Sequence, residues 1–459
     1  MRITTLFIFL LFVLSCKKES FTTSPGAVLS TETDTLHFDT VFTSTGSVTQ
    51  RFKIFNDNSK GIHISAIQIK GGISSPFKIN ANGITGPVIN SIDIPGNDSL
   101  YVFVTVSINP SVANLPFVVR DSIEVWSNGN KKVVQLEAYG RNAHFFRSRI
   151  IEADETWSND LPYVILGGVE IEPDVKLTIN EGCKIYLHAD APMVVSGTLE
   201  VLGKKFDSTR VIFTGDRLDE PYQNYPASWP GIYFNPSSKD NVINYALIKN
   251  AYQAIVVLNP STTLKAKLSL AQTIIDNSYE SGLVGVNTSI TAQNLLISNC
   301  ANNLALVGGG NYQFTHATIV SYGNNFIQHK TPVLLLSDYY DGAPNSLNAI
   351  FRNCIFWGEG GLIENEVEVK TKSTANSIKF DNVLWKVKNA PVTPTGKVFN
   401  QDPLFDSINT AKNFYNFHFN EKNSPAVDNG GNTSITLDLD GNLRPKPATL
   451  PDLGCYEKQ

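Results

Sequence analysis

Apolar and polar residues recur along the second half of the chain at intervals typical of stacked coils of β-strand. Six residues align in one column, with successive spacings of 27, 22, 22, 37 and 29 residues: Tyr245, Gln272, Asn294, His316, Asn353 and Asn382. The two equal spacings indicate a coil of constant length, and the longer ones indicate loops inserted into that coil. The sequence therefore predicts a solenoid, which we place at residues 145–395.

The residues around this column predict where each coil bends. Positions two before, one after and three after the column are apolar or small in all six repeats. Positions one and three after the column alternate as the inward-facing residues of a strand do. The position two before the column and the position one after it are an odd number of residues apart. Residues on one face of a straight strand are an even number apart, so the chain must turn near the column itself. The column therefore predicts a corner of the coil rather than part of a helix.

Two further columns predict features of the coil surface. Five residues after the corner, Asn250, Asn277 and Asn299 predict a ladder of stacked amides that satisfies polar groups at a buried turn. Two residues after the corner, alternation points outward, yet the column is mostly aliphatic: Leu247, Ile274, Leu296, Thr318, Ile355 and Leu384. Either these residues form an aliphatic outer ribbon covered by loops, or the phase of the alignment is wrong. We favour the ribbon.

Residues 31–142 alternate apolar and polar residues in short stretches, such as RFKIFND and IHISAIQIKGG, separated by Gly, Asn, Asp and Pro. This spacing predicts a β-sandwich, and Asn128-Gly129 predicts a two-residue hairpin turn. The order of the stretches, with Pro95-Gly96 and Asn109-Pro110 between them, resembles the immunoglobulin-like modules of the ASPM/SPD-2/Hydin type. The resemblance implies a spacer or a protein-binding module.

The start of the predicted solenoid repeats short β stretches closed by Gly, Pro or Asp, as in LTINEG, GTLEVLG and WPGIYF. These stretches resemble the entry coils of right-handed parallel β-helices of the pectin-lyase-like type. The tail, residues 396–459, contains DPLF, NSPAVDNG, DLDGNLRP and PDLGCYE in that order. It resembles the choice-of-anchor Q segment that follows many secreted β-helices, with Cys455 in place of the usual Ala. The fold class expected is all-β, an Ig-like sandwich followed by a right-handed parallel β-helix.

The N-terminal segment predicts export and attachment to a membrane. One Arg precedes an apolar run that is too short to span a bilayer comfortably, as in a secretion signal. The run ends in Val13-Leu14-Ser15-Cys16, which resembles a bacterial lipobox. The resemblance implies a signal peptide at residues 1–15, a lipidated Cys16 and a linker at residues 16–30. An ordinary signal peptide is the alternative. Lys17-Lys18 after the cysteine implies an outer-membrane lipoprotein.

Composition limits the partners. The net charge is −5 with 17% charged residues, so no electrostatic feature predicts binding to nucleic acid. The four cysteines after Cys16 fit no paired zinc pattern, and we expect buried small hydrophobes, with one disulfide as the alternative. Asp438, Asp440 and Asn442 alternate as in a calcium loop, but Leu443 stands where that loop needs glycine. We expect carboxylates bonded to Arg444 and turn amides, and no metal or cofactor.

Catalytic signatures of β-helix enzymes are missing from the sequence, which contains neither Asp-Asp nor Gly-His-Gly. Two histidines, His316 and His329, and two carboxylates, Glu359 and Glu364, are the remaining candidates for catalysis. A histidine beside the Asp338–Asp341 stretch would suit a lyase, with His329 as the candidate, but the favoured interpretation is a solvated loop with a structural histidine. Six aromatic residues are candidates for sugar stacking, although packing in the core or cap is the favoured role of the first four: Trp157, Tyr222, Tyr225, Trp229, Tyr339 and Tyr340.

Two functions are consistent with this sequence. The favoured one is a lipid-anchored, non-catalytic protein that binds a polysaccharide or a surface protein. The alternative is a polysaccharide lyase or glycoside hydrolase with a divergent site. Fold alone does not separate them, because function belongs to sites placed on a fold. Two or more carboxylates converging with an Arg, Lys or His in an outer groove would favour the enzyme.

Overall fold

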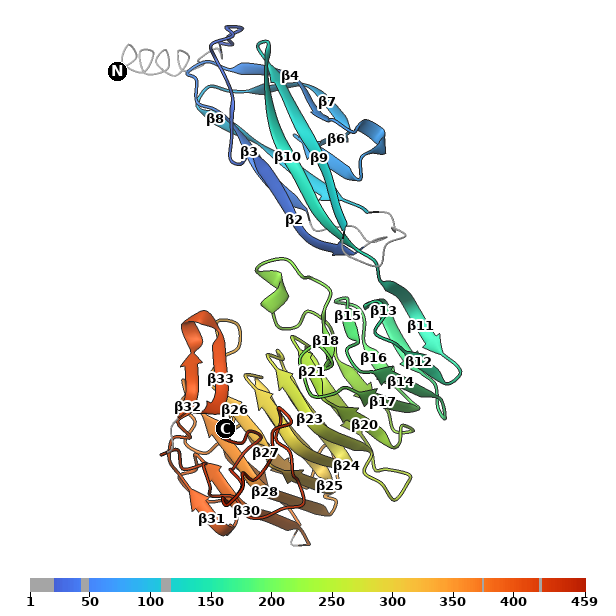
Figure 1. The fold of residues 1–459 in the computed structure, drawn as a ribbon, viewed down its shortest axis with the longest axis vertical. Helices are drawn as coiled ribbons and strands as arrows, with labels where there is room; N and C mark the ends of the chain where they lie inside the picture. The colour runs from blue at the N-terminus through green and yellow to red at the C-terminus, as the bar shows by residue number, and fades with distance from the viewer. Residues whose placement is uncertain (1–19, 43–48, 109–116, 374, 421–422) are drawn as a thin grey trace, which may run out of the picture. The chain divides into compact units, whose positions relative to one another are not determined.

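The structure, a computed structural model, describes residues 20–42, 49–108, 117–373, 375–420 and 423–459 (Figure 1). The chain divides between Ala143 and His144 into two compact units. Cys16 and the predicted signal segment lie outside the described residues. The described elements are β-strands and three short 3-10 turns, η1 (Gly72–Ser74), η2 (Tyr222–Asn224) and η3 (Thr410–Lys412). Within the same ranges, no helix has the length and apolar character needed to cross a bilayer.

The first unit contains two five-stranded sheets. The first sheet is β1 (Ser30–Thr31), β3 (Gln50–Asn56), β8 (Asp98–Val106), β5 (Phe77–Ala81) and β6 (Ile84–Gly86). The second is β2 (Thr35–Phe42), β10 (Asn130–Arg141), β9 (Phe117–Ser127), β4 (Ile62–Ile69) and β7 (Val88–Ile94). One hydrophobic core joins the inward residues of both sheets, such as Phe52 and Ile123, so the sheets pack face to face. Asn128 and Gly129 both have positive φ and join β9 to β10, which confirms the predicted hairpin turn.

The second unit winds a sheet of parallel strands into successive coils. Its strands are β11 (His144–Ile151), β12 (Glu155–Trp157), β13 (Tyr163–Ile171), β14 (Lys176–Asn180), β15 (Lys184–Leu187), β16 (Met193–Val195), β17 (Thr198–Leu202), β18 (Val211–Gly215), β19 (Ile232–Phe234), β20 (Asn241–Asn244), β21 (Ala246–Lys249), β22 (Gln253–Leu258), β23 (Leu268–Asp276), β24 (Ser281–Ser298), β25 (Asn302–Thr315), β26 (Thr318–Ser321), β27 (Leu334–Ser337), β28 (Leu347–Gly358), β29 (Val367–Lys370), β30 (Ser377–Trp385) and β31 (Thr395–Phe399). An antiparallel pair follows, β32 (Phe405–Asn409) and β33 (Phe414–Phe419).

The register of these coils confirms the predicted alignment. The residues two before the column are register partners, each paired with the one in the next coil: Ile243, Leu270, Ala292, Phe314, Phe351 and Phe380. All six are buried, as are the residues one and three after the column. The coil interior is therefore built from the columns that the sequence predicted.

The alignment column is a corner, as predicted. All six of its residues have φ between 43° and 56°: Tyr245, Gln272, Asn294, His316, Asn353 and Asn382. The left-handed conformation costs an ordinary L residue roughly 1–2 kcal/mol, and asparagine tolerates it best. This single residue reverses the phase of alternation, so the residue two before it and the residue one after it both face inward.

The predicted amide ladder is right for one step and wrong for the next. Asn277 Nδ2 donates to Asn250 Oδ1 at 2.8 Å. The following contact comes from Asn324, whose Nδ2 donates to Asn277 Oδ1 at 2.9 Å, while Asn299 Oδ1 accepts from the Tyr322 amide. At this step, therefore, an asparagine from the segment after β26 takes the donor role that the ladder assigns to Asn299.

The outer ribbon exists, and the tail of the chain covers it. Leu296, Ile355 and Leu384 are at most 4% exposed. They form a second apolar core with residues of β33 and the C-terminal segment, among them Phe417, Ala426, Leu439, Leu453 and Cys455. The favoured interpretation of this column is confirmed, and its cover is the C-terminal segment.

The four described cysteines, Cys183, Cys300, Cys354 and Cys455, are free and buried. Burial raises the pKa of the Cys183 thiol to about 11. The prediction of buried small hydrophobes is therefore confirmed, and the alternative of one disulfide is wrong.

Truncating the ribbon should destabilise the second unit. Ile355 is fully buried between the coil and the tail, so Ile355→Ala should cost about 2–5 kcal/mol of unfolding free energy, seen as a lower urea midpoint. Ile350→Ala on the same strand is the matched control, because Ile350 is 36% exposed and should change stability by less than about 0.5 kcal/mol. Equal effects of the two substitutions would contradict the covered ribbon.

Candidate functional site

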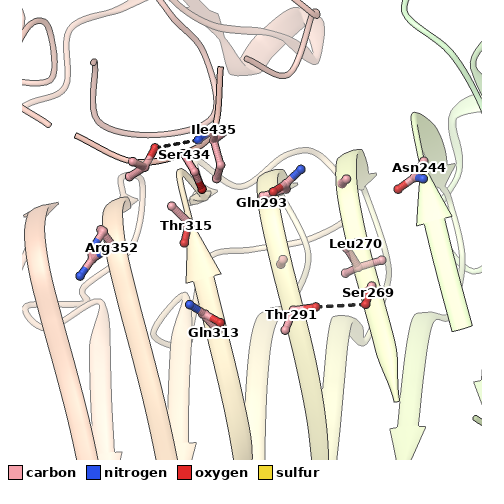
Figure 2. Close-up of a pocket in the computed structure, with 13 residues that line it drawn as sticks. Asn244, Ser269, Leu270, Thr291, Gln293, Gln313, Thr315, Arg352, Ser434 and Ile435 are labelled. Carbon is pink, nitrogen blue, oxygen red and sulfur yellow. Dashed lines mark hydrogen bonds between the residues drawn. The ribbon is translucent and has the colours of Figure 1, made fainter. Parts of the chain in front are cut away.

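An open groove runs over the outer face of the sheet formed by β20, β23, β24, β25 and β28, and Figure 2 shows the residues that line one part of it. It consists of two adjoining hollows of about 450 Å³ and 650 Å³ that share Thr291 and Gln313. Most of the lining side chains are uncharged and polar, and many come from these strands: Asn244, Ser269, Thr291, Gln293, Asn311, Gln313, Thr315 and Asn348. The groove therefore crosses several coils.

Alternation along the strands places these polar side chains in rows. Inward residues such as Leu270, Ala292 and Phe314 fill the core, so their neighbours on either side point outward. The parallel register then aligns Ser269, Thr291 and Gln313 across three coils. Thr291 Oγ1 donates to Ser269 Oγ at 3.1 Å within this row (Figure 2). A second row holds Gln293, Thr315 and Arg352.

The C-terminal segment forms one wall of the groove, through Thr433, Ser434 and Ile435. The corner residues hold this wall in place. Asn353 makes two hydrogen bonds to the backbone of Gly431, at 2.7 and 2.8 Å, and His316 Nε2 lies 3.2 Å from Thr433 Oγ1. The corner column therefore both turns the coil and positions the groove wall.

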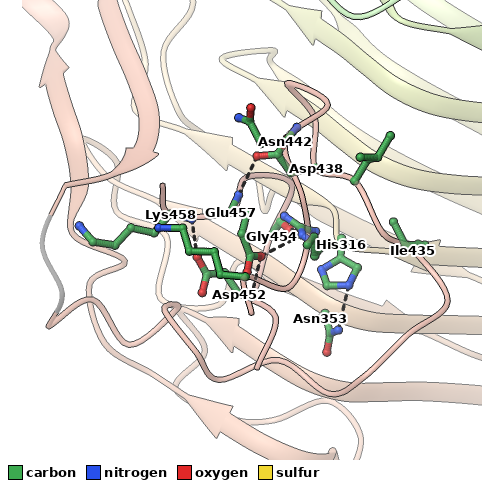
Figure 3. A network of polar contacts seen from close by, with 12 residues as sticks. His316, Asn353, Ile435, Asp438, Asn442, Asp452, Gly454, Glu457 and Lys458 are labelled. Atoms are coloured by element: carbon green, nitrogen blue, oxygen red, sulfur yellow. Dashed lines mark hydrogen bonds and ion pairs between the residues drawn. The ribbon is translucent and has the colours of Figure 1, made fainter. Parts of the chain in front are cut away.

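A buried network ties the rest of this segment to the same corners (Figure 3). Arg444 is 2% exposed, and it donates to Asn294 Oδ1 at 3.1 Å and to Glu457 Oε2 at 3.1 Å. Asp438 accepts the amides of Asp440, Asn442 and Glu457, and Asp452 accepts those of Asp428 and Lys458. We call Arg444, Glu457, Asp438 and Asp452 the tail network.

Burial is the main influence on the ionisation of the tail network. It raises the pKa of Glu457 to about 7, and it raises the pKa of Asp438 and Asp452 above their ordinary values. Burial and the nearby Arg444 charge lower the pKa of His316 well below its usual range. His316 is therefore neutral at pH 7 and acts as a hydrogen-bonding corner residue.

The groove itself carries little charge. Arg352 Nε donates to Asp381 Oδ2 at 3.0 Å, so this cation is already paired. Among the described residues that line the two hollows, none is Asp, Glu or His, and Lys265 is the other cation. Acid–base cleavage of a glycosidic bond commonly requires two carboxylates facing the sugar. The groove offers donors and acceptors for hydroxyl groups instead.

Two of the predicted sugar-stacking residues are core residues. Trp157 and Trp229 are each 1% exposed and belong to the core of the second unit. Their indole nitrogens are satisfied within the chain, by Glu155 and by the Lys249 carbonyl. The favoured role of core packing is therefore confirmed for both rings, and they are not sugar-stacking residues.

Tyr222 and Tyr225 lie in the loop around η2 and form an aromatic cluster with Phe326. The ring centroids are 5.1 Å apart between Tyr222 and Tyr225, and 4.7 Å apart between Tyr225 and Phe326. Tyr222 and Phe326 are about 40% exposed, and Arg217 covers one face of the Tyr222 ring at 3.9 Å. Sequence reasoning missed Phe326, because its loop shows no periodicity.

Tyr339 and Tyr340 lie in the loop after β27. Tyr340 is 62% exposed, whereas Lys372 covers the Tyr339 ring at 3.7 Å. The same loop continues to Asn345 and Ser346, which line the groove. Asp338 in this loop accepts the amides of Lys372 and Ser373 and the side chain of Asn376, so it is a structural carboxylate.

The catalytic candidates do not converge in the groove. Glu359 and Glu364 form separate ion pairs, with Lys386 at 3.4 Å and with Lys388 at 3.1 Å. His329 does not contact Asp338; its Nε2 lies 2.8 Å from Oε1 of Glu366, and both side chains are buried. The sequence did not single out Glu366. His329 and Glu359 line a different hollow, of about 680 Å³.

No group of three or more metal-ligating side chains exists within the described part of the chain. In the loop that contains Asp438, the carboxylate oxygens of this residue are already hydrogen-bonded within the chain. The carboxylate of Asp438 accepts three backbone amides, which is the turn arrangement expected from the sequence. Its neighbour Arg444 pairs with Glu457 rather than with Asp438.

No known protein family matches this chain, and no curated protein matches it. Solved structures show only weak likeness. A family 123 glycoside hydrolase from Clostridium perfringens is 13% identical over 28% of this chain and 26% of its own, with a TM-score of 0.19. A PapD-like domain of human CEP192 is 11% identical over 28% of this chain and 94% of its own, with a TM-score of 0.18.

A third likeness covers more of the chain. The catalytic domain of a GH87 α-1,3-glucanase, solved with nigerose, is 10% identical over 74% of this chain and 81% of its own, with a TM-score of 0.20. Similarity this weak supports no inference about function. The residues of this chain are the basis for that inference.

The tail network should make stability depend on pH. Because the folded-state pKa of Glu457, about 7, exceeds its ordinary value of 4.5, its contribution to stability is complete below about pH 4.5 and is lost as pH rises through about 7. Glu457→Gln removes this titration. As the pH rises from about 5 to about 8, the melting temperature of the wild type should therefore fall relative to that of the variant.

The matched control is Glu364→Gln, whose carboxylate is 65% exposed and pairs with Lys388. It should follow the wild-type pH profile. A Glu457→Gln variant that is destabilised equally at every pH would contradict the assigned ionisation.

Proposed function

We propose that this chain is a lipid-anchored envelope protein whose second unit binds glycan without cleaving it. The observation that carries the proposal is the groove, part of which Figure 2 shows, in which the uncharged row of Ser269, Thr291 and Gln313 crosses three coils. Glycan hydroxyls both donate and accept hydrogen bonds, as do the amides and hydroxyls of Gln293, Gln313 and Thr291. The rows repeat about every 4.8 Å, so an extended polymer meets similar groups along the groove.

The lining also distinguishes a glycan from a protein partner. Protein interfaces depend on buried aromatic and Arg anchors in well-packed pockets. Among the described residues that line the groove, the one aromatic side chain is Tyr312, which is 3% exposed, and Arg352 is already paired with Asp381. The exposed rings of Tyr222 and Phe326 form a separate surface for stacking.

The architecture proposed around this site is that of an exported lipoprotein. Cys16 carries the lipid in the outer membrane, the first unit is an Ig-like spacer of the ASPM/SPD-2/Hydin type, and the tail is a choice-of-anchor Q type cap. The second unit is a right-handed parallel β-helix of the pectin-lyase-like type. Its parallel pairing supports this assignment, because crossovers between parallel strands are nearly always right-handed.

Removing the amides of the groove should weaken glycan binding. We expect Gln293→Ala with Gln313→Ala to lower the affinity for the polysaccharide that binds best in a panel of neutral and acidic polymers by about 10-fold or more. Affinity electrophoresis followed by calorimetry measures the change. Gln401→Ala, an exposed glutamine outside the groove, is the control and should bind as the wild type does. Unchanged affinity in the double variant would exclude this groove as the binding site.

The catalytic alternative, a polysaccharide lyase or glycoside hydrolase with a divergent site, has one specific observation in its favour. The Glu366 carboxylate lies 2.8 Å from His329 Nε2 and could orient the imidazole as a general base beside the hollow that contains Glu359. It ranks second because the side chain of His329 is 2% exposed and that of Glu366 is fully buried.

An assay for new chain ends separates the two functions. We expect incubation with the same polysaccharide panel to yield neither new reducing ends nor unsaturated sugars. Cleavage that is lost in His329→Gln but retained in Gln328→Ala, a neighbour lining the same hollow, would establish the enzyme.

A further inference from the structure

One face of the first unit combines exposed aromatic rings with cations that have no ion-pair partner within the described part of the chain. Arg51 and Lys53 on β3 lie in register with Phe103 and Tyr101 on β8. Their inward neighbours, such as Phe52 and Val102, are fully buried in the core, so these four side chains point away from it. We call Arg51, Lys53, Tyr101 and Phe103 the β3–β8 face.

The rings and cations of this face contact one another. Arg51 Cζ lies 5.0 Å and Lys53 Nζ 4.8 Å from the centroid of the Tyr101 ring. The Tyr101 and Phe103 rings are stacked with centroids 6.1 Å apart, and they remain 37% and 39% exposed. The face therefore presents a continuous surface of two rings flanked by two positive charges.

The two sheets of the first unit differ in how their cations are paired. On the second sheet, Arg120 pairs with Glu137 at 2.7 Å and Lys131 pairs with Glu124 at 3.0 Å, while Lys132 reaches Asp34 at 2.8 Å. Among the described residues, neither Arg51 nor Lys53 has a carboxylate within ion-pair distance. The carboxylate of Glu32 instead accepts the backbone amide of Lys53, at 3.0 Å. The positive charge of the β3–β8 face is thus available to a ligand.

The described residues closest to Cys16 in the sequence are bound to the first unit. Gly61 donates to the Ser20 carbonyl at 2.8 Å and accepts from the Thr22 amide at 2.9 Å. Ala27 and Leu29 are buried in the core of the same unit. Ser20 comes only four positions after Cys16 in the sequence, and that interval spans at most about 14 Å.

The β3–β8 face begins near this tethered end. β3 and β8 meet there at the Asn56–Asp98 pair, and Asn56 Nδ2 donates to the carbonyl of Lys60, next to Gly61. Tyr101 lies three residues along the strand, about 10 Å from that end. An anchored chain therefore holds the face within reach of the membrane surface.

We propose that the β3–β8 face binds the anionic headgroup layer of the membrane. Arg and Lys attract lipid phosphates, and tyrosine is favoured where an apolar body meets a polar interface. The first unit then lies on the bilayer rather than extending freely from its anchor. This surface goes beyond the proposed glycan binding; only its orientation uses the Cys16 anchor, and its affinity does not.

The test uses the full mature chain from Lys17 onward, without lipid, so that binding reports the face and not an acyl anchor. It is mixed with phosphatidylcholine vesicles prepared with or without phosphatidylglycerol, and co-sedimentation is measured. We expect binding only to the anionic vesicles, weakened by added salt. Arg51→Gln with Lys53→Gln should weaken it about 10- to 30-fold, and Tyr101→Ala should weaken it further.

The matched control is Lys131→Gln with Lys132→Gln, which removes the same charge from the second sheet, where both lysines are paired. It should bind as the wild type does. The proposal fails if the control loses as much affinity as the β3–β8 variant, if the wild type ignores the anionic lipid, or if soluble polygalacturonate competes as a preferred ligand. Glycan binding by the second unit is measured separately, so failure of one proposal does not imply failure of the other.

Discussion

A single left-handed residue in each of six coils is the constraint on which the rest of the second unit depends. Because this residue reverses the alternation of the strand, the residue two before it and the residue one after it both face the core, as Leu270 and Thr273 do around Gln272. The same reversal leaves the next position, such as Leu296 and Ile355, pointing outward. An aliphatic ribbon on the outside requires a cover, and the C-terminal segment supplies it.

That cover has a functional consequence. The corner side chains that turn the coil, Asn294, His316 and Asn353, also hydrogen-bond the tail. Their hydrogen bonds bring Thr433 to Ile435 against the sheet as a wall of the polar groove. Packing of the ribbon, burial of the tail network and the shape of the groove are therefore linked, and a change that releases the tail should alter all three.

The sequence predicted the features that depend on local periodicity. The inward columns, the corner and the ribbon follow from alternation, and the Asn128-Gly129 turn follows from backbone preference. The sequence did not predict contacts between segments that are distant along the chain. The hydrogen bond from Asn324 to Asn277, the pairing of His329 with Glu366 and the wall at Ser434 join residues whose separation in sequence has no period. Trp157 and Trp229 were ambiguous because an aromatic residue suits a core and a sugar equally.

The groove, the β3–β8 face and the His329–Glu366 pair differ in charge, and therefore in the kind of ligand each can bind. The groove is nearly neutral, the β3–β8 face is positive and aromatic, and the His329–Glu366 pair is almost closed to solvent. The most direct test of glycan binding by the groove is a crystal structure with a bound oligosaccharide. We expect sugar density over the Ser269, Thr291 and Gln313 row, beside Ser434. Density confined to the hollow beside His329, or to the Tyr222 and Phe326 cluster, would contradict the proposed groove.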